Sequence, residues 1–422
     1  MCGLYGMVLQ EITIHIYINN FINTKMKKLF KYALLCAALC TLSMSFTACG
    51  SDDDNNSSET TDPNQGRSAA DIVYSQQNAA AWGNYMVAVA RLLNTDASML
   101  YDMWNGGTNY GGTSYASYFK SHNSKDFSSA LNCVEQIIDG CVTIASEVGS
   151  TKIGDPYNLY VAGKTTEALY AVESWYSWHS ITDYANNIRS IRNAYYGSRD
   201  GSVNPNSLSA VLAKNNPNLD NQTKAAILDA INKIEAIPDP FRNNINSKQS
   251  QEAMDACGDL SDFLGTTLKS YFQSTAAVNS DAVLDPVVKQ YVDGVVVPTY
   301  LELKNANASL LNAVQAFQKS PSNAGFEACA KAWLVSREPW ESSEAFLFGP
   351  VTDLGLDPNM DSWPLDQAGI VKVLSSQAWK EMEWTGDFDE DNTEIAAAQA
   401  LRGFHTLEFL VFRDGKARTL ND

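Results

Sequence analysis

The sequence has few histidines and lacks any closely paired cysteine motif. Its 422 residues include 4 histidines and 8 cysteines, and no two cysteines have the C-x-x-C spacing of zinc ribbons and redox motifs. An H-E-x-x-H segment is also absent, which argues against a zinc protease of the usual kind. Basic residues are scarce, since 30 Lys and Arg face 48 Asp and Glu for a net charge of −18. We therefore expect no nucleic-acid partner.

Long hydrophobic runs are missing as well. The apolar stretch at 33–42 is too short to span a bilayer. It follows a lysine-rich start at 26–31 and leads into Phe46-Thr47-Ala48-Cys49, an order that resembles a bacterial lipoprotein signal with its lipobox. The resemblance implies cleavage before Cys49 and lipidation of its thiol. An uncleaved anchor over 26–48 is the alternative.

The N-terminal region therefore divides into two parts. Residues 1–48 combine an over-extended start with the signal peptide. Residues 49–68 are polar and include Asp52-Asp53-Asp54, so we predict a disordered acidic tether. An acidic run after a lipidated cysteine is similar to the surface-export signal of Bacteroidetes lipoproteins. We expect an outer-membrane lipoprotein exposed at the cell surface, with the periplasmic face as the alternative, that meets the membrane through its lipid anchor only.

The rest of the chain has a helical pattern. Apolar residues recur at steps of three and four, most clearly over 292–317, where Pro298 should kink the helix near its start. Glycine- and proline-containing stretches at 105–124 and 348–363 are predicted loops. Other helices are predicted at about 69–95, 125–148, 157–196, 206–214, 222–236, 249–273, 322–347, 365–380 and 391–412.

These helices predict an all-α protein with enough material for two bundles. Small polar residues place a domain boundary near 274–285. We therefore expect one helical domain at 69–278 and a second at 279–422.

The segment 403–411 holds the most credible chemistry. His405 and Glu408 are three residues apart, so their Cβ atoms should lie about 5–6 Å apart on one helix face. An imidazole and a carboxylate so placed can share a metal ion. Gly403 lets another helix or a ligand approach closely. The alternative is a buried histidine held by its glutamate partner.

Two other polar stripes have helical spacing. Arg337, Glu341 and Glu344 fall on one face, where they either contribute to a site or simply pair across helices. The second stripe covers an arc of about 120° and indicates a polar cleft or a hydrogen-bonded helix contact. This stripe comprises Ser177, Ser180, Asp183 and Asn187.

Several segments resemble the imelysin-like family of bacterial envelope proteins. Residues 403–408 match its G-x-H-x-x-E motif, 336–350 are similar to its A-R-x-P-Y-E-x-x-E-x-F segment, and Trp363-Pro364-Leu365-Asp366 match its W-P-L-D/E segment. Glu147 fits a G-x-x-x-x-E segment, and 173–188 is similar to an S-x-F-S-x-x-T-x-x-D stretch. The motif order is reversed relative to the usual order, which indicates a circular permutation.

The resemblance implies two packed four-helix bundles with a site at their interface and a role in iron or haem acquisition. Iron is the expected cargo, with zinc or haem as alternatives and an outer-membrane transport partner as its receiver. The expected metal ligands are His405, Glu408 and Glu344. The expected ligand-binding residues are Arg337, Glu341, Trp363, Asp366, Gly403, Ser177, Asp183 and Glu147.

Two other functions stay open. The family's name came from a proteolytic assignment, so a metallopeptidase of the H-x-x-E type is one alternative. A zinc protease usually has two histidine ligands one turn apart, whereas His405 stands alone and His122 and His179 form no paired motif. We therefore do not expect an enzyme. A metal-free lipoprotein that binds a small ligand is the other alternative.

Overall fold

Helices make up nearly all regular structure in residues 72–421, the part of the chain that this computed structural model describes. The prediction of an all-α fold is confirmed. Cys49, the signal peptide expected at 1–48 and the tether expected at 49–68 lie outside the described residues. Among the described helices, none is both long and apolar enough to cross a membrane.

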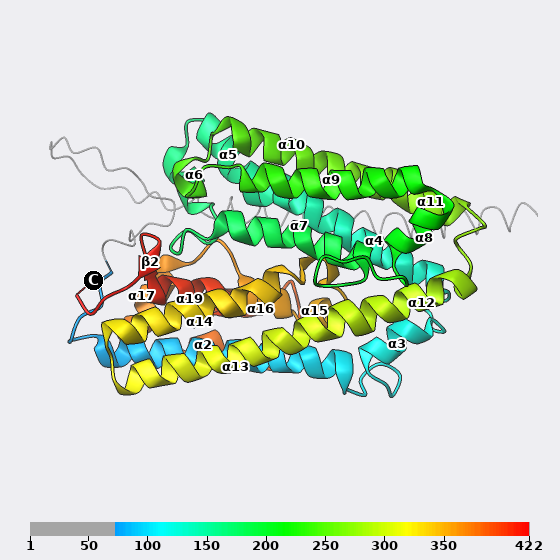
Figure 1. The fold of residues 1–422 in the computed structure, drawn as a ribbon. Helices are drawn as coiled ribbons and strands as arrows, with labels where there is room; N and C mark the ends of the chain where they lie inside the picture. Colours follow the sequence, from blue (N-terminus) through cyan, green and yellow to red (C-terminus); the bar gives the residue numbers. More distant parts are fainter. Residues whose placement is uncertain (1–71, 422) are drawn as a thin grey trace, which may run out of the picture. The chain divides into compact units, whose positions relative to one another are not determined.

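Four helices form a first bundle, in which α4 and α9 each pack against both α7 and α10 (Figure 1). Its apolar faces are buried, as Ile137, Cys141 and Ile144 show on α4, because residues three and four apart share one side of a helix. The four helices are α4 (Ala130–Glu147), α7 (Ser180–Tyr196), α9 (Pro217–Glu235) and α10 (Lys248–Asp262).

A second bundle is built around α13, which packs along both α2 and α14, while α19 also contacts these two helices (Figure 1). Here α2 comes from the N-terminal side of the boundary expected near 274–285, so the two bundles are not successive segments of the chain. The four helices are α2 (Ala79–Asn105), α13 (Val297–Lys319), α14 (Asn323–Glu341) and α19 (Gly403–Val411).

Three π-helical segments interrupt the long helices. Residues 292–317 lie in η5 and α13, which continue directly from the preceding helix, and Pro298 follows η5. Its missing N–H removes one helical hydrogen bond just after the π-helical turn. The three segments with the helices they join to are η2 (Val148–Ile153) before α5 (Gly154–Val161), η4 (Phe263–Leu268) before α11 (Lys269–Ser274), and η5 (Val292–Val296) after α12 (Asp281–Tyr291).

The prediction of a single helix at 157–196 is wrong. The chain instead forms α5, then α6 (Thr165–Tyr170), then an irregular segment at 171–179 before α7. Ser174 and Trp178 have positive φ angles of 53° and 60°, which no α-helix accommodates. This backbone turns two amide groups toward a buried carboxylate, as described below.

Other predicted helices are shorter than expected. The helix expected at 322–347 ends at Glu341 and is followed by the 3₁₀ turn η6 (Glu344–Phe346), while 391–412 contains two helices, α18 (Thr393–Gln399) and α19. The predicted loops at 105–124 and 348–363 contain helices of four to seven residues, too short to reveal a periodicity. The remaining elements are α3 (Tyr115–Ser121), α8 (Leu208–Asn215), η3 (Phe241–Asn243), α15 (Pro350–Asp353), α16 (Leu356–Asp361), α17 (Gln367–Ser376), η7 (Trp379–Met382), and an antiparallel pair of β1 (Phe412–Arg413) and β2 (Lys416–Ala417).

Candidate functional site

A cluster of charged side chains is buried where α7 and η2 of the first bundle approach α14 and α19 of the second. At its centre are His405 and Arg337, both with 0 % of their surface exposed. Ionised groups are almost never buried unless they are paired. The pairing partners therefore decide what this interface can do.

The imidazole of His405 has a carboxylate at each ring nitrogen. Its Nδ1 lies 2.9 Å from Glu408 Oε2, and its Nε2 lies 3.0 Å from Asp361 Oδ1 and 3.5 Å from Glu173 Oε1. Burial and the charge of Arg337 lower the pKa of His405, but Asp361 and Glu173 outweigh them and raise it well above its ordinary value. Carboxylates thus face both ring nitrogens and favour the protonated form of His405, while Nη2 of Arg337 also lies 3.3 Å from Nε2.

Glu408 holds this ring in place. Its second oxygen, Oε1, accepts hydrogen bonds from the amide of Tyr176 at 3.1 Å and from the amide and hydroxyl of Ser177, both at 2.7 Å. Both oxygens of Glu408 are thus engaged, and the two side chains bond to each other. The His405 nitrogen that faces the other acidic groups is Nε2. The positive-φ backbone at 174–178 supplies the amides, which is why a helix cannot continue through this segment.

The guanidinium of Arg337 reaches four carboxylates. Nη2 lies 2.6 Å from both Glu173 Oε1 and Glu341 Oε1, Nε lies 3.5 Å from Asp183 Oδ2, and Nη1 pairs with Asp361. Burial opposes the charge of Arg337, but these neighbours raise its pKa above the ordinary value. Arg337 is therefore a fixed positive centre between the two bundles.

Lys152 brings a second fixed cation from η2. Its Nζ lies 3.1 Å from Glu173 Oε2 and 3.7 Å from Glu344 Oε1, and its side chain is only 9 % exposed. Burial raises the pKa of Glu173, but Lys152 and the hydrogen bond to His405 outweigh it and lower that pKa to about 2. Burial raises the pKa of Glu344 and of Glu341 well above the ordinary value, against the charges of Lys152 and Arg337.

Two sets of ligand atoms in this cluster are close enough to hold a metal ion. Glu173, Asp361 and His405 form one set, Glu341, Glu344 and Asp361 form the other, and within each set the atoms lie within 4.8 Å of one another. Acidic side chains outnumber the cationic groups Arg337, Lys152 and His405, but burial raises the pKa of Glu147, Glu341 and Glu344 and so favours their neutral forms. A bound cation would instead favour the ionised carboxylates. The carboxylates that face one another here are Glu147, Glu173, Asp183, Glu341, Glu344, Asp361 and Glu408.

Most of the expected site residues lie in this cluster. Trp363 packs its ring edgewise on His405 with the ring centres 4.9 Å apart, and Glu147 lies close enough to Lys152 to affect its pKa. Gly403 starts α19 at φ +90°, and a Cβ there would come within 2.6 Å of Met360 O, so this glycine allows α16 to pack closely.

Asp366 does not join the cluster. Its carboxylate is exposed and accepts a hydrogen bond of 2.9 Å from the amide of Gly369, which caps α17. Glu173, Asp361 and Lys152 also belong to the cluster but were not predicted from the sequence. Glu173 is the first residue of the family-like stretch 173–188, and Asp361 lies two residues before Trp363. Acidic residues that flank the motifs were the available signal.

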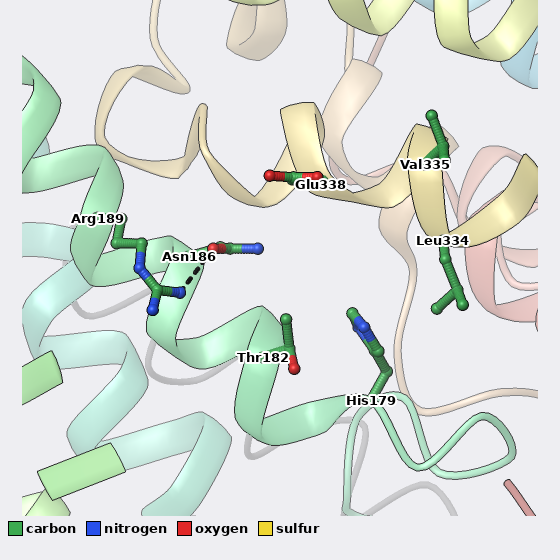
Figure 2. A pocket seen from close by; sticks show the side chains of 7 residues that line it. All are labelled: His179, Thr182, Asn186, Arg189, Leu334, Val335 and Glu338. Carbon is green, nitrogen blue, oxygen red and sulfur yellow. Dashed lines mark hydrogen bonds between the residues drawn. The ribbon is translucent and has the colours of Figure 1, made fainter. Parts of the chain in front are cut away.

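A surface groove of about 390 Å³ lies beside the cluster, between α7 and α14 (Figure 2). His179 connects the two, because its Nδ1 lies 2.8 Å from Asp183 Oδ1 while Asp183 Oδ2 faces Arg337. Burial lowers the pKa of His179, but Asp183 outweighs it and raises that pKa. The residues lining the groove are His179, Thr182, Asn186, Arg189, Leu334, Val335 and Glu338.

Fold and site together define a class of protein: all-α chains in which two four-helix bundles enclose a histidine–carboxylate–arginine cluster. The family model for imelysin, the peptidase family M75, matches residues 53–266 and 296–422. The chain therefore belongs to the imelysin family.

Two similar proteins give this assignment detail. An imelysin peptidase from Bacteroides ovatus, known from its crystal structure, is 57 % identical and superimposes with a TM-score of 0.81, with 83 % of this chain and 99 % of that chain covered. Iron-regulated protein A of Synechococcus elongatus is 33 % identical over 130 residues. That match spans 31 % of this chain and 32 % of the relative, about a third of its length.

Proposed function

We propose that this protein is an envelope lipoprotein that binds a metal ion for iron acquisition, with the ion held by His405, Glu173 and Asp361. The observation that carries the proposal is the grouping of His405, Glu173 and Asp361, whose ligand atoms lie within 4.8 Å of one another. Protons and the chain's own cations neutralise this buried cluster when no metal is bound. A metal ion would take over that role for the carboxylates that bind it.

The surroundings of His405 suit a metal ligand. Ligating histidines usually donate their other ring N–H to a carboxylate, which fixes the ring and raises its basicity. Glu408 has this position at Nδ1 and is itself held by two backbone amides. Histidine must be neutral to bind a metal. Loading therefore releases the Nε2 proton and moves Arg337 away from Glu173 and Asp361.

Iron is the cargo that the surroundings support best. A mixed imidazole and carboxylate set suits iron, although zinc accepts the same atoms. One relative is named an iron-regulated protein. Haem fits less well, because His405 has no exposed surface and Trp363 packs on its ring. A porphyrin would have to separate the bundles, whereas an ion has only to displace a side chain.

Peptidase activity is the second candidate, and the name of the similar Bacteroides ovatus protein favours it. The ligand set opposes it. Within residues 72–421, the other two histidines are bonded elsewhere, His179 to Asp183 and His122 to Asp285 at 2.5 Å. A catalytic zinc usually has at least two histidine or cysteine ligands, whereas the set here has His405 and two carboxylates. Hydrolysis of casein by zinc-loaded protein, lost on Glu408→Gln, would favour the peptidase.

Calorimetric titration of the full protein with ferrous, ferric and zinc ions and with haem tests the binding proposal. We expect saturable binding of an iron ion that a His405→Ala/Asp361→Asn double variant loses. Asp366→Asn is the matched control, because this carboxylate is exposed and outside the cluster. Equal binding by wild type and double variant would overturn the proposal.

The location is a separate part of the proposal. We expect Cys49 to carry the lipid that holds the protein at the outer membrane, where a transport partner receives the cargo. A Cys49→Ala variant should leave the membrane fraction and fail to incorporate labelled palmitate. Protease treatment of intact cells then distinguishes the surface, where the protein is digested, from the periplasmic face, where it is protected.

A further inference from the structure

A second group of acidic side chains adjoins the proposed metal position. Glu341, Glu344 and Asp361 place ligand atoms within 4.8 Å of one another. The ammonium of Lys152 lies next to this group, 3.7 Å from Glu344 Oε1. A buried cation of the chain itself thus lies beside one member of the second set of ligand atoms.

Shared carboxylates connect the two positions. Glu173 directs Oε1 toward His405 and Arg337, and Oε2 toward Lys152 at 3.1 Å. Asp361 belongs to both sets of ligand atoms. Dinuclear metal centres in helical bundles are built with carboxylates that two adjacent cations share. In this cluster one cation is an ammonium group.

A buried acceptor without a donor lies on a side chain that is bonded to Glu341. Asn187 is fully buried and donates from Nδ2 to Glu341 Oε2 at 2.5 Å. Its own Oδ1 has no hydrogen-bond donor among the described residues. Buried polar atoms are nearly always satisfied, so an acceptor of this kind needs an explanation. A cation that also binds Glu341 would supply one.

The backbone presents Lys152 in an unusual way. Lys152 lies in η2, one of the three π-helical segments, between Val148 and Ile153. π-Helical turns occur frequently at functional sites. Gly149 in this segment lies so close to α10 that a Cβ would be 3.0 Å from Met254 O. The close packing fixes η2 against α10 and holds the lysine stem toward the cluster.

We propose that Lys152 is a resident cation that fills the second position and limits the site to one metal ion. The proposal rests on the metal-binding function proposed above. A lysine ammonium is a compact point charge with three donors, so it can satisfy several carboxylate oxygens when no second ion is bound. Removing the amine should open a divalent-cation position formed by Glu341, Glu344 and Asp361.

Manganese is a suitable probe, because carboxylate ligands accept Mn²⁺ readily. We would measure the Mn²⁺ bound per full chain by elemental analysis after desalting. Wild type should bind one ion and Lys152→Met two. The added ion should disappear in Lys152→Met/Glu344→Gln. Lys269→Met is the control, since Lys269 pairs with Asp139 at the surface of the first bundle, and it should bind one ion.

The outcomes separate the two proposals. One ion in both wild type and Lys152→Met would overturn the role of Lys152 and leave the proposed function standing. No ion in wild type would overturn the proposed function itself. If Lys152→Met does not fold without metal, circular dichroism follows its refolding as Mn²⁺ is added. Refolding supports the second position, and failure to refold at saturating Mn²⁺ overturns it.

Discussion

Among the buried arginines of residues 72–421, Arg402 and Arg337 have partners of very different composition. Arg402, at the start of α19, pairs with Asp96 of α2 and also donates to Met382 O at 3.4 Å. One cation meets one carboxylate there, and both side chains are 5 % exposed. Arg337 instead meets four carboxylates. The Arg402 pair joins two helices of one bundle, whereas the Arg337 cluster gathers carboxyl groups from several segments around one guanidinium.

The largest expected effect on stability comes from changing Arg337. Arg337→Met leaves several carboxylates without their cation, and the loss of one partner from a buried network is strongly destabilising. We expect the free energy of unfolding in metal-free buffer to fall by about 5 kcal/mol. Saturating Mn²⁺ should restore part of it. Urea unfolding with and without Mn²⁺ measures both.

The matched control is Arg189→Met. Arg189 pairs with Glu235 at the surface, with its side chain 29 % exposed, so its loss should change stability by about 0–1 kcal/mol. An equally small effect of Arg337→Met would mean that the cluster does not depend on its central arginine.

Changing the Arg402–Asp96 pair should lower stability in a way that metal does not restore. Asp96→Asn leaves Arg402 buried without its counter-ion, and we expect a loss of about 3 kcal/mol in urea unfolding. Because Asp96 belongs to neither set of ligand atoms, Mn²⁺ should not restore the loss and metal affinity should not change. A metal-dependent rescue would contradict the distinction between the two networks.

Glu408→Gln addresses the support of the metal ligand. A glutamine cannot hold the imidazole with a full negative charge, and loss of such a partner usually lowers metal affinity by about 10–100-fold. Calorimetric titration with Fe²⁺ should show this decrease with an unchanged number of ions. Asp366→Asn should leave the affinity unchanged. No decrease for Glu408→Gln would mean that ring orientation does not matter for binding.

The smallest expected effect is the change in affinity with pH. The carboxylates of Asp361 and Glu173 raise the pKa of His405 against the effects of burial and Arg337, so we expect the metal to displace a proton from the ring. Affinity should rise about tenfold per pH unit until this pKa is passed. Titrations in buffers of different ionisation enthalpy count the proton released. His405→Gln should show neither the release nor the slope.

The same pKa shifts determine stability without metal. The raised pKa of His405 contributes to the free energy of unfolding. This contribution is complete below pH 6.5 and is lost as pH rises through the shifted pKa. The pKa of Glu173, lowered from 4.5 to about 2, gives a contribution that is complete above pH 4.5 and lost as pH falls toward 2. Urea unfolding measured across this pH range should show stability decreasing at both the acid and the alkaline end. Glu173→Gln should remove much of the decrease at the acid end.

Sequence patterns gave the helices but not every break in them. The periodicity of 292–317 predicted the long buried face of α13 correctly, because repeated apolar spacing has no other good explanation. The same reasoning wrongly predicted a single helix at 157–196. The break at 171–179 depends on Glu408, more than 200 residues away, whose carboxylate binds the amides of Tyr176 and Ser177. Local pattern contains no trace of such a partner.

The site was predicted in part. The spacing of His405 and Glu408 correctly placed both side chains on one helix face, and they contact each other. The position of Asp366 in a motif suggested a site residue, yet its carboxylate caps α17. Glu173 and Asp361 went unnoticed, because each lies on an irregular segment or at a helix end where no periodicity marks it.

The sequence by itself determined the helices, the acidic character and the pair on α19, since these depend on side-chain spacing and charge alone. Only the tertiary structure decided which charges meet. Packing α7 and η2 against α14 and α19 brings Arg337, Lys152 and His405 among carboxylates from distant segments. Burial then strengthens the interactions between these charges, because water no longer screens them, and it raises the pKa of carboxyl groups such as Glu341 and Glu344.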